Sequence, residues 1–332
     1  MKMILARWRL LLSGFALCSL LATAALALWA GAEIASPSRR PLLDFHREFL
    51  ANPTARGFSI AGFTASDGSP CLVCTPYSSG QLGERGRKIR QQLTERGFHL
   101  LPAGSVFGTV VLVHGRRGRK EDYLPIAERL CAVGLRCIIP DLPAHGDHPA
   151  TLATYGVREA SLPARMLEEA SRRGSFDPKP AGLVGLSMGG SVSVHAAALA
   201  DAPWAALVVI ASFDSLPAVI EGQVAQYMGT TLATPWLAGA DLVYHRKTGV
   251  HLAEVQPQHH AASIGIPTLI AHGTADRVSS ITRGQRLFAA LPSATTKQWV
   301  EIPDAGHDDV LITAYPIYAE IAGWLLQHLA GK

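Results

Sequence analysis

The alternation of short apolar runs with amphipathic stretches constrains the fold of this chain most strongly. Six short runs are predicted as strands, most of them apolar, and helical patterns separate most of them: "TVVLVHG", "LRCIIPD", "AGLVGLS", "AALVVIAS", "IPTLIAHG" and "TKQWVEIP". Uninterrupted apolar strands are typical of a parallel sheet that helices cover on both faces. The sequence therefore predicts an α/β fold with a mostly parallel central sheet.

Further elements are expected on either side of these strands. A first apolar run begins near Phe58, and a second one follows the pair Asp67-Gly68. Such a pair between two apolar runs predicts a β-hairpin. Helices are expected over residues 82–96, 152–173 and 312–329. The last of these has an amphipathic pattern and closes the chain.

About fifty residues between the strands that end near Ser212 and begin near Ile266 do not follow the alternation. A segment of this length inside a compact domain usually forms a functional element. We therefore expect an inserted helical cap at about residues 213–262, and its aromatic residues Tyr227 and Trp236 are candidates for substrate contact. The alternative is a surface insertion without a role.

The first thirty residues differ from the rest of the chain. Residues 10–30 carry no charge, and they follow the basic residues Lys2, Arg7 and Arg9. The run is long enough to span a membrane, but Ala30 and Ala32 also form an A-x-A processing site. Both interpretations place the body outside the cytoplasm, in the cell envelope as an outward-facing anchored protein, or periplasmic or secreted if the segment is cleaved. A retained anchor would make the membrane a partner of the chain.

The chain is accordingly divided into three parts. Residues 1–32 form the signal or anchor segment, residues 33–57 a connector, and residues 58–332 the main domain. Only 17% of the residues are charged and the net charge is +4, so nucleic-acid binding is not expected.

Four cysteines lie outside the apolar N-terminal run, namely Cys71, Cys74, Cys131 and Cys137. Cys71 could bridge to Cys74, and Cys131 could bridge to Cys137, as an oxidising compartment permits. Free buried thiols are the equal alternative.

The strongest chemical signal is the sequence "VGLSMGG" at residues 184–190. Gly185, Ser187 and Gly189 form a G-x-S-x-G motif between a predicted buried strand and a helix of small residues. This context supports a strained strand-to-helix turn that exposes the serine, and the glycines are needed because side chains there would collide with neighbouring strands. We predict that Ser187 is a nucleophile.

A serine hydroxyl needs a base, and the base needs a carboxylate that orients it. His307 follows the last strand and precedes the final helix, so it can reach the same edge of the sheet. Asp276 follows the strand "IPTLIAHG" and precedes His307, and we favour it as the acid over Asp214. His114 and His145 precede the serine and are interpreted as hydrogen-bonded loop residues.

Acyl chemistry at a serine also needs donors for an oxyanion. The backbone amide of Met188 is one candidate, and the amide of Arg116, in the loop after "VVLVHG", is the other. The same loop carries Arg117, Arg119 and Lys120. These cations suggest a basic rim that attracts an anionic substrate, with Arg117 as the candidate contact, although a solvated loop is the simpler alternative.

Five segments together resemble the α/β-hydrolase superfamily: "VHGRRGRKEDYLPIAERL", "IIPDLPAHG", "GLSMGG", "IPTLIAHGTAD" and "PDAGH". The likeness is greatest to the esterase and serine-aminopeptidase-like branches of that superfamily. The resemblance covers the chain from about residue 58 to the C-terminus. It implies hydrolysis of a small-molecule acyl substrate through an acyl-enzyme, without a metal or other cofactor. A peptidase with Glu221 or Glu254 as an acidic anchor, and a non-catalytic binding module, are the alternatives.

Overall fold

The computed structural model describes residues 2–78 and 81–330, without the side chains of residues 2–12 and 15–17. Within this part of the chain an eight-stranded sheet has the order β1-β2-β4-β3-β5-β6-β7-β8. Its strands are β1 (Phe58–Thr64), β2 (Pro70–Pro76), β3 (Gly108–Val113), β4 (Leu135–Pro140), β5 (Ala181–Leu186), β6 (Trp204–Ile210), β7 (Thr268–Gly273) and β8 (Lys297–Ile302). The strands β1, β2 and β4 pair antiparallel, and the remaining pairs are parallel. The predicted hairpin and the mostly parallel sheet are thus confirmed.

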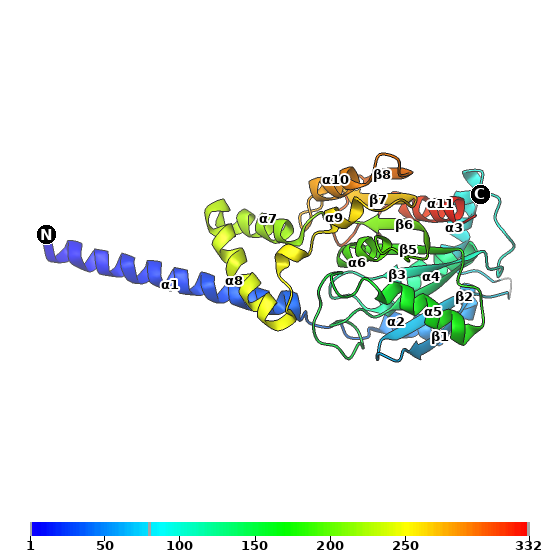
Figure 1. Cartoon of the computed structure of the whole chain (residues 1–332), viewed down its shortest axis with the longest axis horizontal. Helices are drawn as coiled ribbons and strands as arrows, with labels where there is room; N and C mark the ends of the chain where they lie inside the picture. Colours follow the sequence, from blue (N-terminus) through cyan, green and yellow to red (C-terminus); the bar gives the residue numbers. More distant parts are fainter. Residues whose placement is uncertain (1, 79–80, 331–332) are drawn as a thin grey trace.

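Helices cover both faces of the sheet (Figure 1). They are α1 (Lys2–Ala35), α2 (Asp44–Ala51), α3 (Glu84–Glu95), α4 (Leu124–Ala132), α5 (Leu162–Gly174), α6 (Met188–Ala197), α7 (Leu216–Met228), α8 (Thr230–Thr248), α9 (Pro257–Ala261), α10 (Ile281–Ala290) and α11 (Ile317–Leu329). The 3-10 turns are η1 (Thr54–Arg56), η2 (Lys120–Tyr123) and η3 (Leu252–Glu254). One apolar cluster joins the sheet to α5, α6 and α10 through Met166, Val192 and Leu287. The other joins it to α3, α4 and α11 through residues such as Leu93 and Leu325.

Two helices begin later than the sequence suggested. The helix expected from residue 152 begins at Leu162, because Glu159 accepts hydrogen bonds from Thr154 and from the Gly156 amide and holds the preceding residues in turns. The helix expected from residue 312 begins at Ile317. Its start is delayed because Pro316 disfavours helical backbone at the residue before it.

The expected insertion between β6 and β7 is helical and contains α7, α8 and α9. Its longest helix, α8, packs along α1, and the two backbones approach so closely that a Cβ atom on Gly31 would overlap the carbonyl of Ala240. Figure 1 shows α1 lying against α8 with its C-terminal part and extending beyond the body with its N-terminal part.

The end of α1 is built into the main domain. Ala35 is fully buried, and its carbonyl accepts a hydrogen bond from the amide of Ala153. The hydroxyl of Tyr155 donates to the carbonyl of Ile34. Within α1, Cys18–Ala35 has a mean hydropathy of 1.6, and by length and composition it could cross a membrane.

All five cysteines lie in the described part of the chain and carry free thiols. Cys18 is exposed on α1, and the other four are buried. Burial raises the pKa of the thiols of Cys71, Cys74 and Cys131. Of the two alternatives, the structure therefore has free buried thiols.

Candidate active site

Ser187 stands at a sharp turn between β5 and α6. Its φ of 54° and ψ of −117° lie outside the helix and strand regions, and such strain is typical of a functional position. The neighbouring turn is crowded, since a Cβ atom on Gly189 would lie 2.5 Å from the carbonyl oxygen of His114. The predicted need for glycine is therefore physical: α6 can begin here only because Gly189 has no side chain.

The turn lies where the sheet changes direction. The chain runs from β3 to β4 on one side and then to β5 on the other side of β3. In open α/β sheets, ligands bind beyond the carboxyl ends of the strands at such a point. Ser187 follows β5 and Gly115 follows β3, so the two loops face this crevice together.

A chain of hydrogen bonds joins the three predicted residues. The Nδ1 atom of His307 lies 2.7 Å from a carboxylate oxygen of Asp276, and Nε2 lies 2.8 Å from Oγ of Ser187. An ionised carboxylate can only accept, so Nδ1 carries the ring proton. The Nε2 atom is then left to accept a hydrogen bond from the serine hydroxyl, as a general base must.

Asp276 is held by several donors besides His307. The amides of Val278 and Ser279 donate to one carboxylate oxygen, and Nε2 of His272 lies 3.3 Å from the other. Burial alone would raise the pKa of Asp276, but the hydrogen bonds from His272 and His307 outweigh it and hold that pKa well below its usual range. The carboxylate therefore stays ionised and keeps His307 in one tautomer.

The competing residues have other partners. Asp214 is buried and lies 3.3 Å from Arg283, not against His307. His114 accepts a hydrogen bond from the Leu142 amide, and Nδ1 of His145 is 2.8 Å from the carbonyl of Pro143. Both histidines thus have the loop positions that the sequence suggested.

The two amides expected to face an oxyanion also lie at this crevice. Met188 is the first residue of α6, so its amide has no partner in the helix. Arg116 lies in the loop after β3, next to Gly115, and lines the same cavity as Ser187. Within the described part of the chain, neither amide donates a hydrogen bond, and both stay candidates for the oxyanion.

The cations of the Arg116 loop are paired with carboxylates. Glu33, at the end of α1, binds Arg116 at 3.2 Å and Arg117 at 2.6 Å. Arg119 pairs with Glu121 and Asp147, and Lys120 pairs with Asp141, Asp147 and Glu121. The loop is thus not the open basic rim that the sequence suggested.

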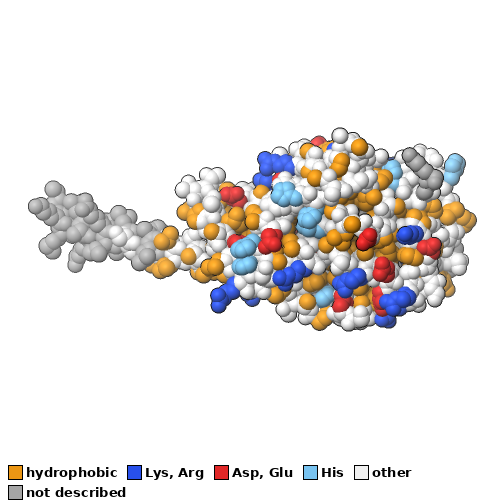
Figure 2. All heavy atoms as spheres, in the orientation of Figure 1, with side chains coloured by type: hydrophobic (Ala, Val, Ile, Leu, Met, Phe, Trp, Pro, Cys, Tyr) orange, Lys and Arg blue, Asp and Glu red, His pale blue; other side chains and the backbone are white. Residues whose placement is uncertain are grey.

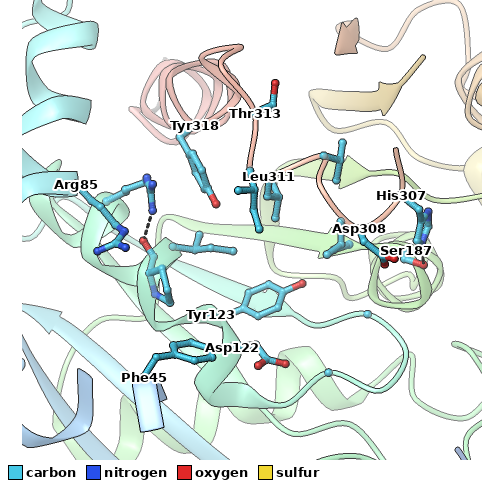
Figure 3. Close-up of a pocket in the computed structure, with 18 of the residues that line it drawn as sticks. Phe45, Arg85, Asp122, Tyr123, Ser187, His307, Asp308, Leu311, Thr313 and Tyr318 are labelled. Carbon is cyan, nitrogen blue, oxygen red and sulfur yellow. Dashed lines mark hydrogen bonds between the residues drawn. The ribbon is translucent and has the colours of Figure 1, made fainter. Parts of the chain in front are cut away.

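A cavity of about 1320 Å³ opens beside Ser187 and His307 (Figure 3). Arg117 is among its lining residues, whereas Tyr227 and Trp236 are not. Tyr227 is 88% exposed on α7, and Trp236 on α8 is half-buried against the core. Instead, residues 310–316 line one wall. Sequence reasoning missed this wall because it assigned most of that segment to the final helix, although Pro316 signalled a later start.

Comparison with known proteins places the chain in a family. Residues 110–319 match the model of the alpha/beta hydrolase family. The chain belongs to this family. It is 25% identical over 210 residues to the uncharacterized protein YfhR of Salmonella typhimurium. The match covers 62% of this chain and 66% of that relative, which is just under two thirds of its length.

Solved structures are similar in fold. The esterase Pf2001 of Pyrococcus furiosus matches with a TM-score of 0.61 and 15% identity, over 89% of this chain and 99% of that protein. A lipase-like protein of Acinetobacter baumannii, described as a putative lipase, matches with a TM-score of 0.55 and 17% identity, over 87% of this chain and 98% of its own. At these identities the likeness concerns the fold alone.

Proposed function

We propose that this protein is a serine hydrolase that cleaves carboxylic esters through Ser187, His307 and Asp276. The observation that carries the proposal is the continuous chain of hydrogen bonds from the Asp276 carboxylate through His307 to the serine hydroxyl. A serine in this arrangement is an activated nucleophile. Membership of a hydrolase family supports the same chemistry.

The reaction has two halves. Oγ of Ser187 attacks the acyl carbon while Nε2 of His307 takes the hydroxyl proton, and the resulting oxyanion faces the amides of Met188 and Arg116. The tetrahedral intermediate expels the alcohol, which receives the proton from His307, and leaves an acyl-enzyme. Water then attacks the acyl group with His307 as base, and the acid departs as Ser187 regains its proton.

Charge in the cavity favours an ester over a peptide substrate. A peptidase that trims free N-termini needs an acidic group for the substrate ammonium. The earlier candidates Glu221 and Glu254 do not line the cavity and are engaged by Thr234 and by the His251 amide. Among the described lining residues, arginine and lysine outnumber the acidic residues by seven to three, and this surplus would repel an ammonium group.

Labelling of the full chain in detergent with a fluorophosphonate tests the activated serine, with Ser187→Ala beside it. We expect labelling of the native protein only, and hydrolysis of p-nitrophenyl esters that the variant lacks. A folded native protein that is neither labelled nor active on any ester of the series would overturn the proposal.

We also propose that α1 is retained as a membrane anchor. A helix of 34 residues is about 50 Å long, which exceeds a hydrocarbon core of about 30 Å. Large apolar side chains are exposed on α1, namely Leu20, Leu21, Leu26, Leu28 and Trp29. Figure 2 shows hydrophobic side chains on the described part of this helix. On the body, the same view shows positive and negative side chains interspersed. Packing of residues 27–35 against the domain supports retention over cleavage.

N-terminal sequencing of the membrane fraction tests retention. A retained anchor leaves the N-terminal segment on the mature chain and keeps it in the membrane after alkaline extraction. A mature chain that begins at Glu33 and is released in soluble form would contradict this part of the proposal.

A further inference from the structure

Basic side chains gather in the cavity at the end away from Ser187. Arg56 of η1, Arg85 and Lys88 of α3, and Arg129 of α4 all line it. In Figure 3, Arg85 lies on the opposite side of the view from Ser187 and His307, with Tyr123, Tyr318 and Leu311 between them. These four basic residues, the distal cations, share one cavity with the serine.

Aromatic rings hold the distal guanidinium groups in place. Arg56 lies 4.1 Å above the ring centroid of Phe49, and Arg129 lies 3.9 Å above that of Tyr318. Such stacking orients a guanidinium while leaving its edge free to donate. The arrangement is therefore more ordered than that of solvated surface arginines.

One buried carboxylate accompanies the distal cations. A single oxygen of Glu128 lies 3.4 Å from Arg85 and 3.9 Å from Arg56, and the side chain of Glu128 is fully buried beneath them. Lys88 is exposed and lines the cavity. Glu48, exposed on α2 next to Phe49, also lines the cavity. Two carboxylates do not balance four cations, so this end keeps a positive surplus.

The end near Ser187 differs. There Arg116 and Arg117 are bound to Glu33, and Arg40 lies 3.3 Å from Asp122. Charge at that end is largely matched within the protein. The sequence had placed anion recognition in the Arg116 loop, but the unbalanced cations lie elsewhere in the cavity.

The wall between the two ends is largely apolar. It includes Ile126, Val310, Leu311 and the rings of Tyr123 and Tyr318. The cavity of about 1320 Å³ exceeds the usual range of about 300–1,000 Å³ for small-ligand pockets. A ligand that fills it must therefore be long, apolar in its middle and anionic at its far end.

We propose that the distal cations bind an anionic oxygen group, such as a carboxylate, at the far end of an amphipathic ester whose scissile bond lies at Ser187. Guanidinium groups recognise such anions through paired, charge-assisted hydrogen bonds. The inference rests on the proposed hydrolase function and adds the substrate class. Selectivity then comes from two fixed points, the serine and the cations, with an apolar spacer of defined length between them.

Two matched series of p-nitrophenyl esters test this proposal. One series consists of monoesters of α,ω-dicarboxylic acids, and the other of esters of monocarboxylic acids with equal chain lengths. We expect the ratio of kcat/KM between charged and neutral esters to peak at one chain length, at about tenfold or more, and to fall in 1 M salt as screening increases.

The double variant Arg85→Gln/Lys88→Gln should lower that ratio by about tenfold or more, mainly through KM of the charged ester. The matched control is Arg87→Gln, which removes a cation of the same helix that does not line the cavity. The control should keep the native ratio. A ratio near one at every chain length, or an equal ratio in the double variant, would overturn the distal anion site while labelling and neutral-ester hydrolysis still upheld the hydrolase.

If the native protein is not labelled and cleaves neither series, the hydrolase proposal fails instead. Calorimetric binding of dodecanedioate and dodecanoate to the Ser187→Ala variant then tests the anion site without catalysis. Tighter binding of the dianion that is lost with Arg85→Gln/Lys88→Gln supports the site, and equal binding of the two acids refutes it.

Discussion

The substitution Gly189→Ala tests the turn that exposes Ser187. The added methyl group would lie 2.5 Å from the carbonyl oxygen of His114, and closer still to that of Val113. Real Cβ atoms essentially never approach another atom within 3.0 Å. The closer contact with Val113 therefore requires α6 to move away from β3 by more than 0.5 Å. Both partners are backbone atoms at the end of a central strand, and no side-chain rotation can relieve the overlap.

The shift falls directly on the reacting atoms. Ser187 and the Met188 amide precede Gly189, and a displacement of about 1 Å at an active site can cost about 100-fold in rate. We expect kcat/KM of p-nitrophenyl esters to fall by about 100-fold, and the free energy of unfolding to drop by about 1–3 kcal/mol, as in other overpacked cores.

The matched control is Gly222→Ala, because a methyl group there meets nothing within 4 Å and lies inside α7. It should keep the activity and stabilise the protein by about 0.5–1 kcal/mol. Urea unfolding and steady-state hydrolysis measure both effects. A Gly189→Ala protein with native stability and native kcat/KM would refute the proposed role of this turn.

Three further predictions concern other parts of the molecule. Asp276→Asn should lower kcat by about 10⁴-fold, since the amide no longer fixes the tautomer of His307; retention of more than a tenth of the rate would speak against the acid. Burial lowers the pKa of His145 to about 3 and that of His195 to about 4. Protons therefore bind the unfolded chain preferentially, and the free energy of unfolding falls as the pH drops below 6.5. The loss is about 2 kcal/mol per histidine between pH 7 and pH 5. Replacing both by Gln should flatten the pH profile of urea unfolding by about 4 kcal/mol over this range, and an unchanged profile would contradict the assignment. Gly31→Val should separate α1 from α8 and increase proteolysis near residue 31, whereas Gly14→Val, with open space around it, should not.

Local signals were sufficient for the sheet and for the residues around the serine. Most of the parallel strands are short apolar runs. The turn at Ser187 requires glycines, and the sequence displays their spacing directly. Asp276 and His307 were predictable because each follows a strand of that sheet, and the carboxyl ends of parallel strands meet at one edge. These inferences need only the alternation of apolar strands with helices along the sequence and the parallel topology of the sheet.

The sequence could not reveal contacts between segments that are remote in the chain. Glu33 lies in an apolar helix, and nothing local shows that it binds Arg116 and Arg117 about eighty residues later. The position of the helical insertion was equally hidden. Its apolar side chains could have covered the serine, but α8 packs along α1, and Tyr227 remains exposed on α7.

The two ends of the cavity depend on different parts of the chain. At the end near Ser187, the three residues of the hydrogen-bond chain lie within residues 110–319, which the family model covers, whereas Glu33 and Arg40 lie before them. Arg56, Arg85 and Lys88 precede residue 110. Packing of α3 against α4 brings Arg85 and Lys88 toward Arg129. Membership of the family therefore supports the chemistry at the serine but says nothing of the charge at the far end. The proposed anion site therefore places substrate preference in the segment before β3. On that proposal, a change of its three basic side chains alters selectivity and leaves every residue of the hydrogen-bond chain in place.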